Sequence, residues 1–406
     1  MRYPLTRRSL LALGTGLLVA PALLPSLPVD ARFWPSPALL PATTPVTTLD
    51  AVLQAALDDG LPGVTLLLEQ GGRVVYSGAA GVANIEDQTP LLTTDRFRIY
   101  SITKTFTAIV TLQLVDEGIL TLDDTVAQWL DAPSVARIPN IDRVTLRQLL
   151  THTSGIYDYA DDNDSPFWED AFLGPNADWT KVWTIEELLA YADGANHAPY
   201  FEPGQGVFYS NTEYILLGLV VEAATGRSFG DELRTRILEP LALSDTFLAE
   251  GGGMPKGIVH GYQLLEGELI DLSASNLSWI WTAGGMVSTT TDLARFARAV
   301  FGGELLSPAS FTEMFTFVAE PGRPDFAFGM GLYQIGSPNG VLVGNDGQSA
   351  GFSSSMMRLT EADITAVVIT NMAPDEGTLD QVRDEAIAWV LAQTPASTNG
   401  AATPTS

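Results

Sequence analysis

Residues 101–104 read Ser-Ile-Thr-Lys, and this stretch decides how the rest of the sequence is interpreted. Apolar residues follow at the spacing of one helix face: Ile102, Phe106, Ile109, Val110 and Leu114. Gly118 stands where this helix is expected to end. The pattern therefore places Ser101 at a helix N-terminus, with Lys104 one turn along on the same side.

These two side chains suit nucleophilic catalysis. A serine hydroxyl is a weak nucleophile until a base takes its proton, and a lysine removed from water loses its own proton more readily. A helix N-terminus adds free N–H groups for an oxyanion. Ser-x-x-Lys alone is also common by chance, with an exposed lysine as the ordinary alternative. The sequence contains only three lysines, Lys104, Lys181 and Lys256, which makes incidental surface charge a weaker explanation.

Tyr209-Ser210-Asn211 is a second candidate. Pro203 and Gly204 before it predict a turn, so the triplet is expected at a loop or helix start. A tyrosine hydroxyl can relay a proton, and an asparagine side chain can donate to and accept from a substrate amide. A core tyrosine beside a capping asparagine is the alternative interpretation.

The third candidate is the run Gly-Asn-Asp-Gly-Gln at 344–348, before a strand-like run that begins at Ser353. Glycines beside a strand let a ligand approach the backbone closely. A plain hairpin turn is the alternative, since Asn, Asp and Gly all favour turns.

Strand patterns occur at both ends of the folded part. Four runs form two predicted hairpins: 64–68 with 74–76, and 353–359 with 364–370. Helical patterns at 49–57 and 379–390 lie beside them, and the middle, about 100–315, reads mostly as helix and loop. We therefore expect an α+β fold with one antiparallel sheet made from both chain ends, flanking helices and an inserted helical lobe.

Composition narrows the class of protein. The 406 residues are 46% hydrophobic and 17% charged, which is typical of a globular chain with one large core and a second lobe. The net charge of −27 argues against nucleic acid and anionic membranes as partners. The absence of cysteine excludes disulfides, thiol catalysis and cysteine metal sites.

The N-terminus predicts export. A basic segment with Arg2, Arg7 and Arg8 precedes a short apolar run, and the stretch 6–11 resembles a twin-arginine signal. We expect an export signal at 1–31, with a retained membrane tether as the alternative, and a periplasmic or extracellular location. A proline-rich linker at 32–48, a folded domain at 49–393 and a disordered tail at 394–406 complete the predicted organisation.

The three candidates, in this order, resemble the family of class C β-lactamases, serine D-alanyl-D-alanine carboxypeptidases and related esterases. Residues 149–155, Leu-Leu-Thr-His-Thr-Ser-Gly, resemble a specific segment of that family, and 283–289 fits its glycine-rich loop. The similarity spans about 49–392.

The resemblance implies a helical lobe set against a mixed α/β lobe, with the site between them. It implies that Ser101 is the acylated nucleophile and that Lys104 and Tyr209 share the roles of base and acid. The implied substrate-binding residues are Asn211, Asn345, Gly347 and Gln348, with backbone N–H groups of Ser101 and Gln348 forming the oxyanion hole. His152 reads as structural in this family, and no metal or organic cofactor is implied.

One departure bears on the substrate. Asn345 stands where the family usually has Lys or His, and a neutral amide holds a substrate carboxylate less strongly than a cation does. This departure weakens the case for substrates that end in a free carboxylate and leaves esters and neutral amides as candidate substrates. We expect a serine hydrolase of the D-alanyl-D-alanine carboxypeptidase type that acts on a small-molecule or peptide substrate: a D-alanyl peptide, an ester or a lactam. An esterase of the same family and a non-catalytic penicillin- or peptide-binding relative are the alternatives.

Overall fold

The computed structural model describes residues 48–162, 165–249, 257–265, 267–373 and 377–393. All of them belong to the second of two compact units, Pro37–Ser406, and the description below is of that unit by itself. The predicted export signal and tail, and the predicted linker except for Thr48, lie outside the described residues. Within the described ranges, no helix combines the length and apolar character needed to cross a bilayer.

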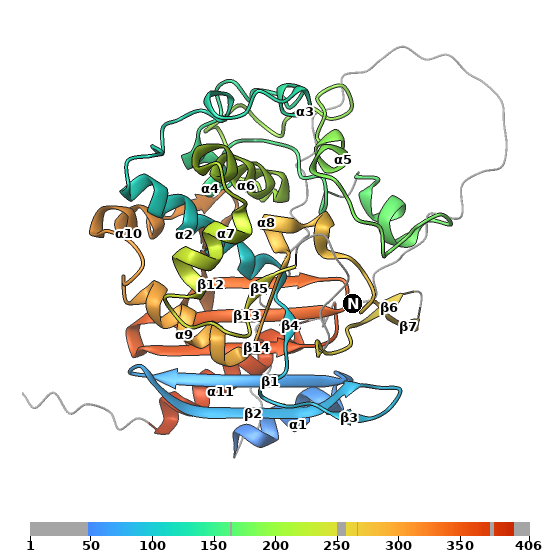
Figure 1. Ribbon diagram of the computed structural model, residues 1–406. Helices are drawn as coiled ribbons and strands as arrows, with labels where there is room; N and C mark the ends of the chain where they lie inside the picture. Colours follow the sequence, from blue (N-terminus) through green and yellow to red (C-terminus); the bar gives the residue numbers. More distant parts are fainter. Residues whose placement is uncertain (1–47, 163–164, 250–256, 266, 374–376, 394–406) are drawn as a thin grey trace, which may run out of the picture. The chain divides into compact units, whose positions relative to one another are not determined.

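A nine-stranded antiparallel sheet forms the centre of the unit (Figure 1). Its strand order is β3-β2-β1-β14-β13-β12-β11-β10-β9, so both chain ends meet where β1 pairs with β14. The strands are β1 (Gly63–Gln70), β2 (Arg73–Asn84), β3 (Thr89–Pro90), β9 (Val318–Glu320), β10 (Arg323–Phe328), β11 (Tyr333–Ser337), β12 (Gly340–Ser349), β13 (Phe352–Leu359) and β14 (Ile364–Thr370). This arrangement confirms the predicted α+β fold and both predicted hairpins.

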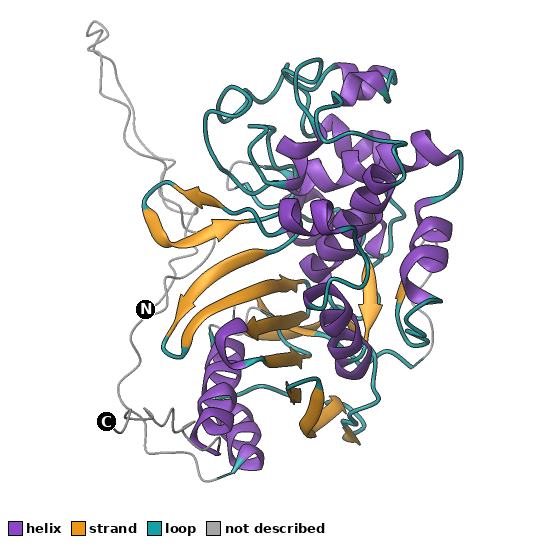
Figure 2. Cartoon of the chain, turned by 90° about the vertical axis from the view of Figure 1, so that its left-hand side faces the viewer, coloured by secondary structure: helices purple, strands orange, loops and turns teal. Residues whose placement is uncertain are grey.

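Helices cover both faces of the sheet (Figure 2). Because side chains alternate along a strand, Val368 of β14 packs toward α1 (Leu49–Asp58) and α11 (Thr378–Gln393), while Val367 packs into the larger core on the opposite face. That opposite face carries α9 (Thr290–Phe301) and then the helical lobe. The predicted helices at 49–57 and 379–390 are confirmed as α1 and α11.

The helical lobe is built around α2 (Thr103–Asp116), whose side chains from Thr103 to Leu112 are all buried. The other helices are α3 (Pro133–Ala136), α4 (Leu146–Leu150), α5 (Ile185–Ala190), α6 (Asn211–Thr225), α7 (Phe229–Leu233), α8 (Trp281–Gly284) and α10 (Pro308–Met314). The sequence predicted one apolar face for α2, but the helix is buried almost all round. Its threonines enter the core because their hydroxyls find carbonyl acceptors, as in the 2.7 Å bond from Thr107 Oγ1 to Thr282 O.

The middle of the chain also contains strands that the sequence patterns missed. The strands β4 (Phe97–Arg98), β8 (Met286–Ser288) and β5 (Phe247–Leu248) form a small sheet, and β6 (Tyr262–Leu265) pairs with β7 (Glu268–Asp271). Runs of two to four residues are too short for alternation to register in a sequence. In addition, 344–348 belongs to β12, which excludes the alternative of a plain hairpin turn there.

Candidate active site

Ser101 lies in a strained turn that leads into α2. A 3₁₀ turn spans Tyr100–Ile102, and Tyr100 has a φ of 39°, in the left-handed region that an aromatic residue rarely adopts. Such a residue costs on the order of 1–3 kcal/mol and persists only where its surroundings fix it. Tyr100 is buried, and its hydroxyl donates to Ala350 O at 2.7 Å. The surrounding structure therefore holds Ser101 in one defined position.

Ser101 lies within hydrogen-bonding distance of both other predicted catalytic side chains, Lys104 and Tyr209. Ser101 Oγ is 2.6 Å from Tyr209 OH, and Lys104 Nζ donates to Ser101 Oγ at 3.1 Å. Lys104 Nζ also donates to Asn211 Oδ1 and to Ala283 O, both at 2.7 Å. The three partners of Lys104 Nζ come from the turn before α2 (Ser101), from α6 (Asn211) and from α8 (Ala283), so three segments converge on one ammonium group.

Burial sets the protonation states of this group. Lys104 is 1% exposed, and burial lowers its pKa to about 7, although the charges of Asp161 and Asp158 oppose the fall. Burial, followed by the charge of Asp161, raises the pKa of Tyr209 well above its usual value. Near neutral pH, Lys104 can therefore be the amine that accepts the Ser101 proton, while Tyr209 remains a phenol.

Asn211 links Lys104 to two carboxylates. Its Nδ2 donates to Asp161 Oδ2 at 2.7 Å and to Asp158 Oδ2 at 3.1 Å, while its Oδ1 accepts from Lys104. Asp158 is buried, and this burial together with the charge of Asp161 raises its pKa to about 7. The sequence does not single out Asp158 and Asp161 within the acidic run at 158–164, since residue type does not reveal which carboxylate points inward.

His152 supports Tyr209 from behind. It is buried, its ring centroid is 4.7 Å from that of Tyr209, and its Nδ1 is hydrogen-bonded to Glu213 Oε2. Burial lowers the pKa of His152 and raises that of Glu213, so this contact is a neutral hydrogen bond in which the carboxyl O–H donates. Among the described residues no hydrogen bond joins His152 to Ser101, which fits a structural role.

The third predicted segment brings its backbone against Ser101. A Cβ atom on Gly347 would lie 2.1 Å from Ile99 O and 2.8 Å from Ser101 N, so only glycine lets β12 approach this closely. Pairing of β12 with β11 ends at Gly344, opposite Tyr333. Beyond Gly344, the edge of β12 that faces β11 has no partner strand among the described residues. The backbone N–H of Gln348 is therefore available for an oxyanion hole formed with the Ser101 N–H.

Asn345 does not occupy the substrate side of this strand. Its amide is buried and donates to Gly331 O at 3.0 Å, with Thr105 Oγ1 at 3.5 Å. In the described structure it makes no hydrogen bond to Ser101 or Tyr209. The expected contact between Asn345 and substrate therefore needs a change of rotamer, and the side chain as it stands braces β12 against the start of α2.

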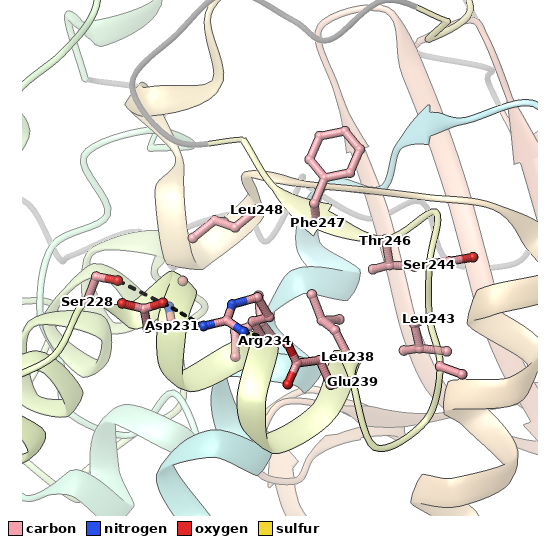
Figure 3. A pocket seen from close by; sticks show the side chains of 13 residues that line it. Ser228, Asp231, Arg234, Leu238, Glu239, Leu243, Ser244, Thr246, Phe247 and Leu248 are labelled. Atoms are coloured by element: carbon pink, nitrogen blue, oxygen red, sulfur yellow. Dashed lines mark hydrogen bonds and ion pairs between the residues drawn. The ribbon is translucent and has the colours of Figure 1, made fainter.

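A metal centre and a second reactive pocket are not evident in the described ranges. No three His, Asp or Glu side chains there could hold a metal ion. A separate pocket lies beside α7 and β5, and both apolar side chains such as Phe247 and the charged Arg234, which is paired with Asp231 and Glu239, line it (Figure 3). Its lining residues make no described hydrogen bond to Ser101, so the chemistry belongs to the Ser101 site.

Known proteins share this architecture. The Beta-lactamase family model matches residues 49–388. Penicillin-binding protein 4* of Bacillus subtilis (strain 168) is 31% identical over 324 residues, which cover 77% of this chain and 68% of that protein. Protein flp of Staphylococcus aureus (strain MRSA252) is 24% identical over 330 residues, or 80% of this chain and 62% of its own length.

Two solved structures are similar over nearly their whole length. A D-stereospecific amidohydrolase from Streptomyces sp. is 34% identical, with a TM-score of 0.73, over 82% of this chain and 97% of its own. D-amino acid amidase from Ochrobactrum anthropi SV3, solved with L-phenylalanine, is 27% identical, with a TM-score of 0.74, over 85% of this chain and 98% of its own.

Replacing the nucleophile or its base should abolish turnover. We expect Ser101→Ala and Lys104→Ala each to lower kcat by roughly 10³-fold or more, and the double variant to be no worse, because the two side chains act as one unit. Steady-state hydrolysis of an activated ester, with circular dichroism as the check of folding, measures this. Substantial activity in a folded Ser101→Ala protein would exclude this serine as the nucleophile.

The pH profile should depend on Asp158. We expect kcat/KM to rise with pH through about 7 as Lys104 loses its proton. Asp158→Asn removes a negative charge that raises the pKa of Lys104, so the acid limb of the profile should move to lower pH. Asp162→Asn is the matched control, since Asp162 accepts from Tyr200 OH rather than from Asn211. An unmoved or higher acid limb in Asp158→Asn would contradict the assignment.

Replacing Gly347 should lower the rate of turnover while the protein still folds. Gly347→Ala forces β12 away from Ser101 N and disturbs the oxyanion hole, for which a loss of about 10²–10³-fold in kcat is expected. Gly336→Ala in β11 is the control, because a Cβ atom there meets only Asp325 Cβ at an ordinary 3.4 Å. Equal kcat values for the two folded variants would show that the approach of Gly347 does not matter.

Proposed function

The chain belongs to the Beta-lactamase family of serine hydrolases, and from this premise we propose that it cleaves amide and ester bonds of D-configured aminoacyl compounds whose leaving group carries no carboxylate. The reaction would proceed through an acyl-enzyme on Ser101. D-alanyl-D-alanine carboxypeptidase activity is the second candidate.

The charge of the site is the observation that carries this proposal. Among the basic side chains in the described part of the chain, only Lys104 hydrogen-bonds to Ser101, Tyr209 or Asn211. It is already engaged by the catalytic group, and two carboxylates, Asp158 and Asp161, lie behind it. A substrate carboxylate would find no fixed cation here and would meet negative charge. Neutral leaving groups avoid that penalty.

The names of the similar structures support the D configuration. One is a D-stereospecific amidohydrolase and another is a D-amino acid amidase, and both cover more than four fifths of this chain. The Bacillus subtilis relative, a penicillin-binding protein by name, is the observation that favours the second candidate. The complete set of Ser101, Lys104 and Tyr209 disfavours a non-catalytic relative.

The proposed cycle uses side chains and backbone N–H groups of this site, together with water. Lys104 takes the proton of Ser101 Oγ, which attacks the substrate carbonyl, and the N–H groups of Ser101 and Gln348 bind the oxyanion. Tyr209 donates its proton to the leaving nitrogen or oxygen, and the ammonium of Lys104 then reprotonates Tyr209. Water then gives a proton to Lys104 as it attacks the acyl carbonyl, the bond from the acyl carbon to Ser101 Oγ breaks to release the acid, and the Lys104 ammonium returns the proton to Ser101 Oγ. The N-terminal pattern supports the further proposal that this activity is exported.

Substrate preference tests the proposal. We expect D-phenylalanine amide and D-phenylalanine methyl ester to be hydrolysed with at least tenfold higher kcat/KM than an N-acetylated D-alanyl-D-alanine peptide. Among the described residues, the site has no fixed cation for the peptide carboxylate, and such a charge contact is typically worth about 1.5–3 kcal/mol. We expect the same preference over the L-enantiomers, in line with the names of the similar structures. Product release is followed by chromatography, with Ser101→Ala as the blank. Preference for the D-alanyl-D-alanine peptide would establish the carboxypeptidase instead.

A further inference from the structure

We propose that Asp346 is a positioning residue for the reaction: from the back of the sheet, it holds in place the β12 backbone that faces Ser101. Its partners are Tyr333 of β11 and Arg383 of α11. This inference rests on the proposed acyl-enzyme at Ser101, but it does not depend on which substrate forms that acyl-enzyme.

The alternation of side chains along β12 places Asp346 on the opposite face from its two neighbours. On the face of the helical lobe, Asn345 donates to Gly331 O at 3.0 Å, and Gly347 makes its close approach to Ser101 N. Asp346 points the other way, where α11 covers the sheet. Side-chain contacts therefore hold this stretch of β12 on both faces.

The contact to Tyr333 lies where the main-chain pairing of β12 with β11 ends. The last pair is Tyr333 opposite Gly344, and among the described residues only β13 pairs with β12 from 345 to 349. The hydroxyl of Tyr333 donates to Asp346 Oδ2 at 2.6 Å. This hydrogen bond therefore connects β11 to β12 two residues beyond the last backbone pair, on the way to the oxyanion hole.

The carboxylate of Asp346 is charged, and Arg383 binds it from α11. Arg383 Nη1 lies 3.4 Å from Asp346 Oδ2, and both side chains are buried. Burial raises the pKa of Asp346 to about 6, and the charge of Arg383 opposes this rise, so the carboxylate is ionised at neutral pH. A hydrogen bond to an ionised acceptor is roughly twice as strong as a neutral one. The bond from Tyr333 is thus a strong connection rather than a weak one.

A small displacement of β12 at this point would be felt at the reacting carbonyl. Asp346 directly precedes Gly347, and Gln348, whose N–H is proposed to bind the oxyanion, follows next. A misplacement of about 1 Å in an active site can cost on the order of 10²-fold in rate. The oxyanion forms only in the transition state, so loosening β12 should weaken transition-state binding in particular.

Two variants test this role. Tyr333→Phe removes one hydroxyl and keeps the ring stacked on Phe326, whose centroid is 5.0 Å away. Asp346→Ala removes the whole carboxylate but leaves no buried cation unpaired, because Arg383 also pairs with two other carboxylates, those of Asp380 and Asp384.

Tyr76→Phe is the matched control. Tyr76 lies in β2 of the same sheet, and its hydroxyl donates to Asp50 Oδ1 at 2.6 Å, the length of the bond from Tyr333 to Asp346. The control therefore removes the same kind of hydrogen bond from the same sheet, but from a strand that does not face Ser101.

The measurements are kcat/KM for 4-nitrophenyl acetate and the inhibition constant of phenylboronic acid, with the full-length protein at pH 7. The boron atom bonds to Ser101 Oγ and becomes a tetrahedral anion that resembles the transition state. We expect kcat/KM to fall and the inhibition constant to rise by the same factor, about tenfold in Tyr333→Phe and about hundredfold in Asp346→Ala. Tyr76→Phe should leave both values unchanged. The inhibition constant is the deciding readout, because a smaller fraction of folded protein lowers the rate without changing it.

The outcomes separate this inference from the proposed function. An inhibition constant that stays unchanged in folded Tyr333→Phe and Asp346→Ala would overturn the positioning role and leave the proposed function standing. Tyr333→Phe alone decides if Asp346→Ala does not fold. An equal rise in Tyr76→Phe would also overturn the role, since any loss of a hydrogen bond in the sheet would then suffice. A wild type that neither hydrolyses the ester nor binds phenylboronic acid would overturn the proposed acyl-enzyme, and this inference with it.

Discussion

The site depends on one lysine being kept out of water. Lys104 is 1% exposed at the start of a helix that is buried almost all round, and its Nζ reaches Ser101, Asn211 and Ala283. Burying an ammonium is costly, and the cost appears as a pKa lowered to about 7. The same burial that would weaken a structural ion pair turns this amine into a base that works near neutral pH.

The rest of the architecture follows from that constraint. The negative charges of Asp158 and Asp161 raise the pKa of Lys104 and so limit the effect of burial. The side-chain amide of Asn211 lies between Lys104 and these two carboxylates and hydrogen-bonds to all three. The neutral contact between His152 and Glu213 backs the tyrosine ring without adding a charge. On the opposite side, Gly347 admits the backbone of β12 to the nucleophile. The helical lobe therefore supplies the side chains that move protons, and the sheet supplies the backbone that faces the oxyanion.

Much of this arrangement could be predicted from the sequence. The spacing of Ser101 and Lys104, the turn before Tyr209 and the strand patterns at both ends are local features, and local patterns survive into the fold. Asp158 and Asp161 could not be singled out, because burial within an acidic run is decided by α6 packing against the loop. The orientation of the Asn345 side chain could not be predicted either, because it is set by a hydrogen bond to Gly331 O, a backbone acceptor 14 residues away. Two-residue strands such as β4 and β5 leave no periodic trace at all.

The lysine content of the chain makes the central claim directly measurable. Only Lys104, Lys181 and Lys256 would give signals in ¹³C NMR of protein labelled at the lysine Cε position, and comparison with Lys104→Ala identifies the first. We predict that the Lys104 signal titrates with a midpoint of about 7. A midpoint near the ordinary value for lysine, about 10.4, would contradict the account, because Lys104 would then remain an ammonium and could not take the proton from Ser101.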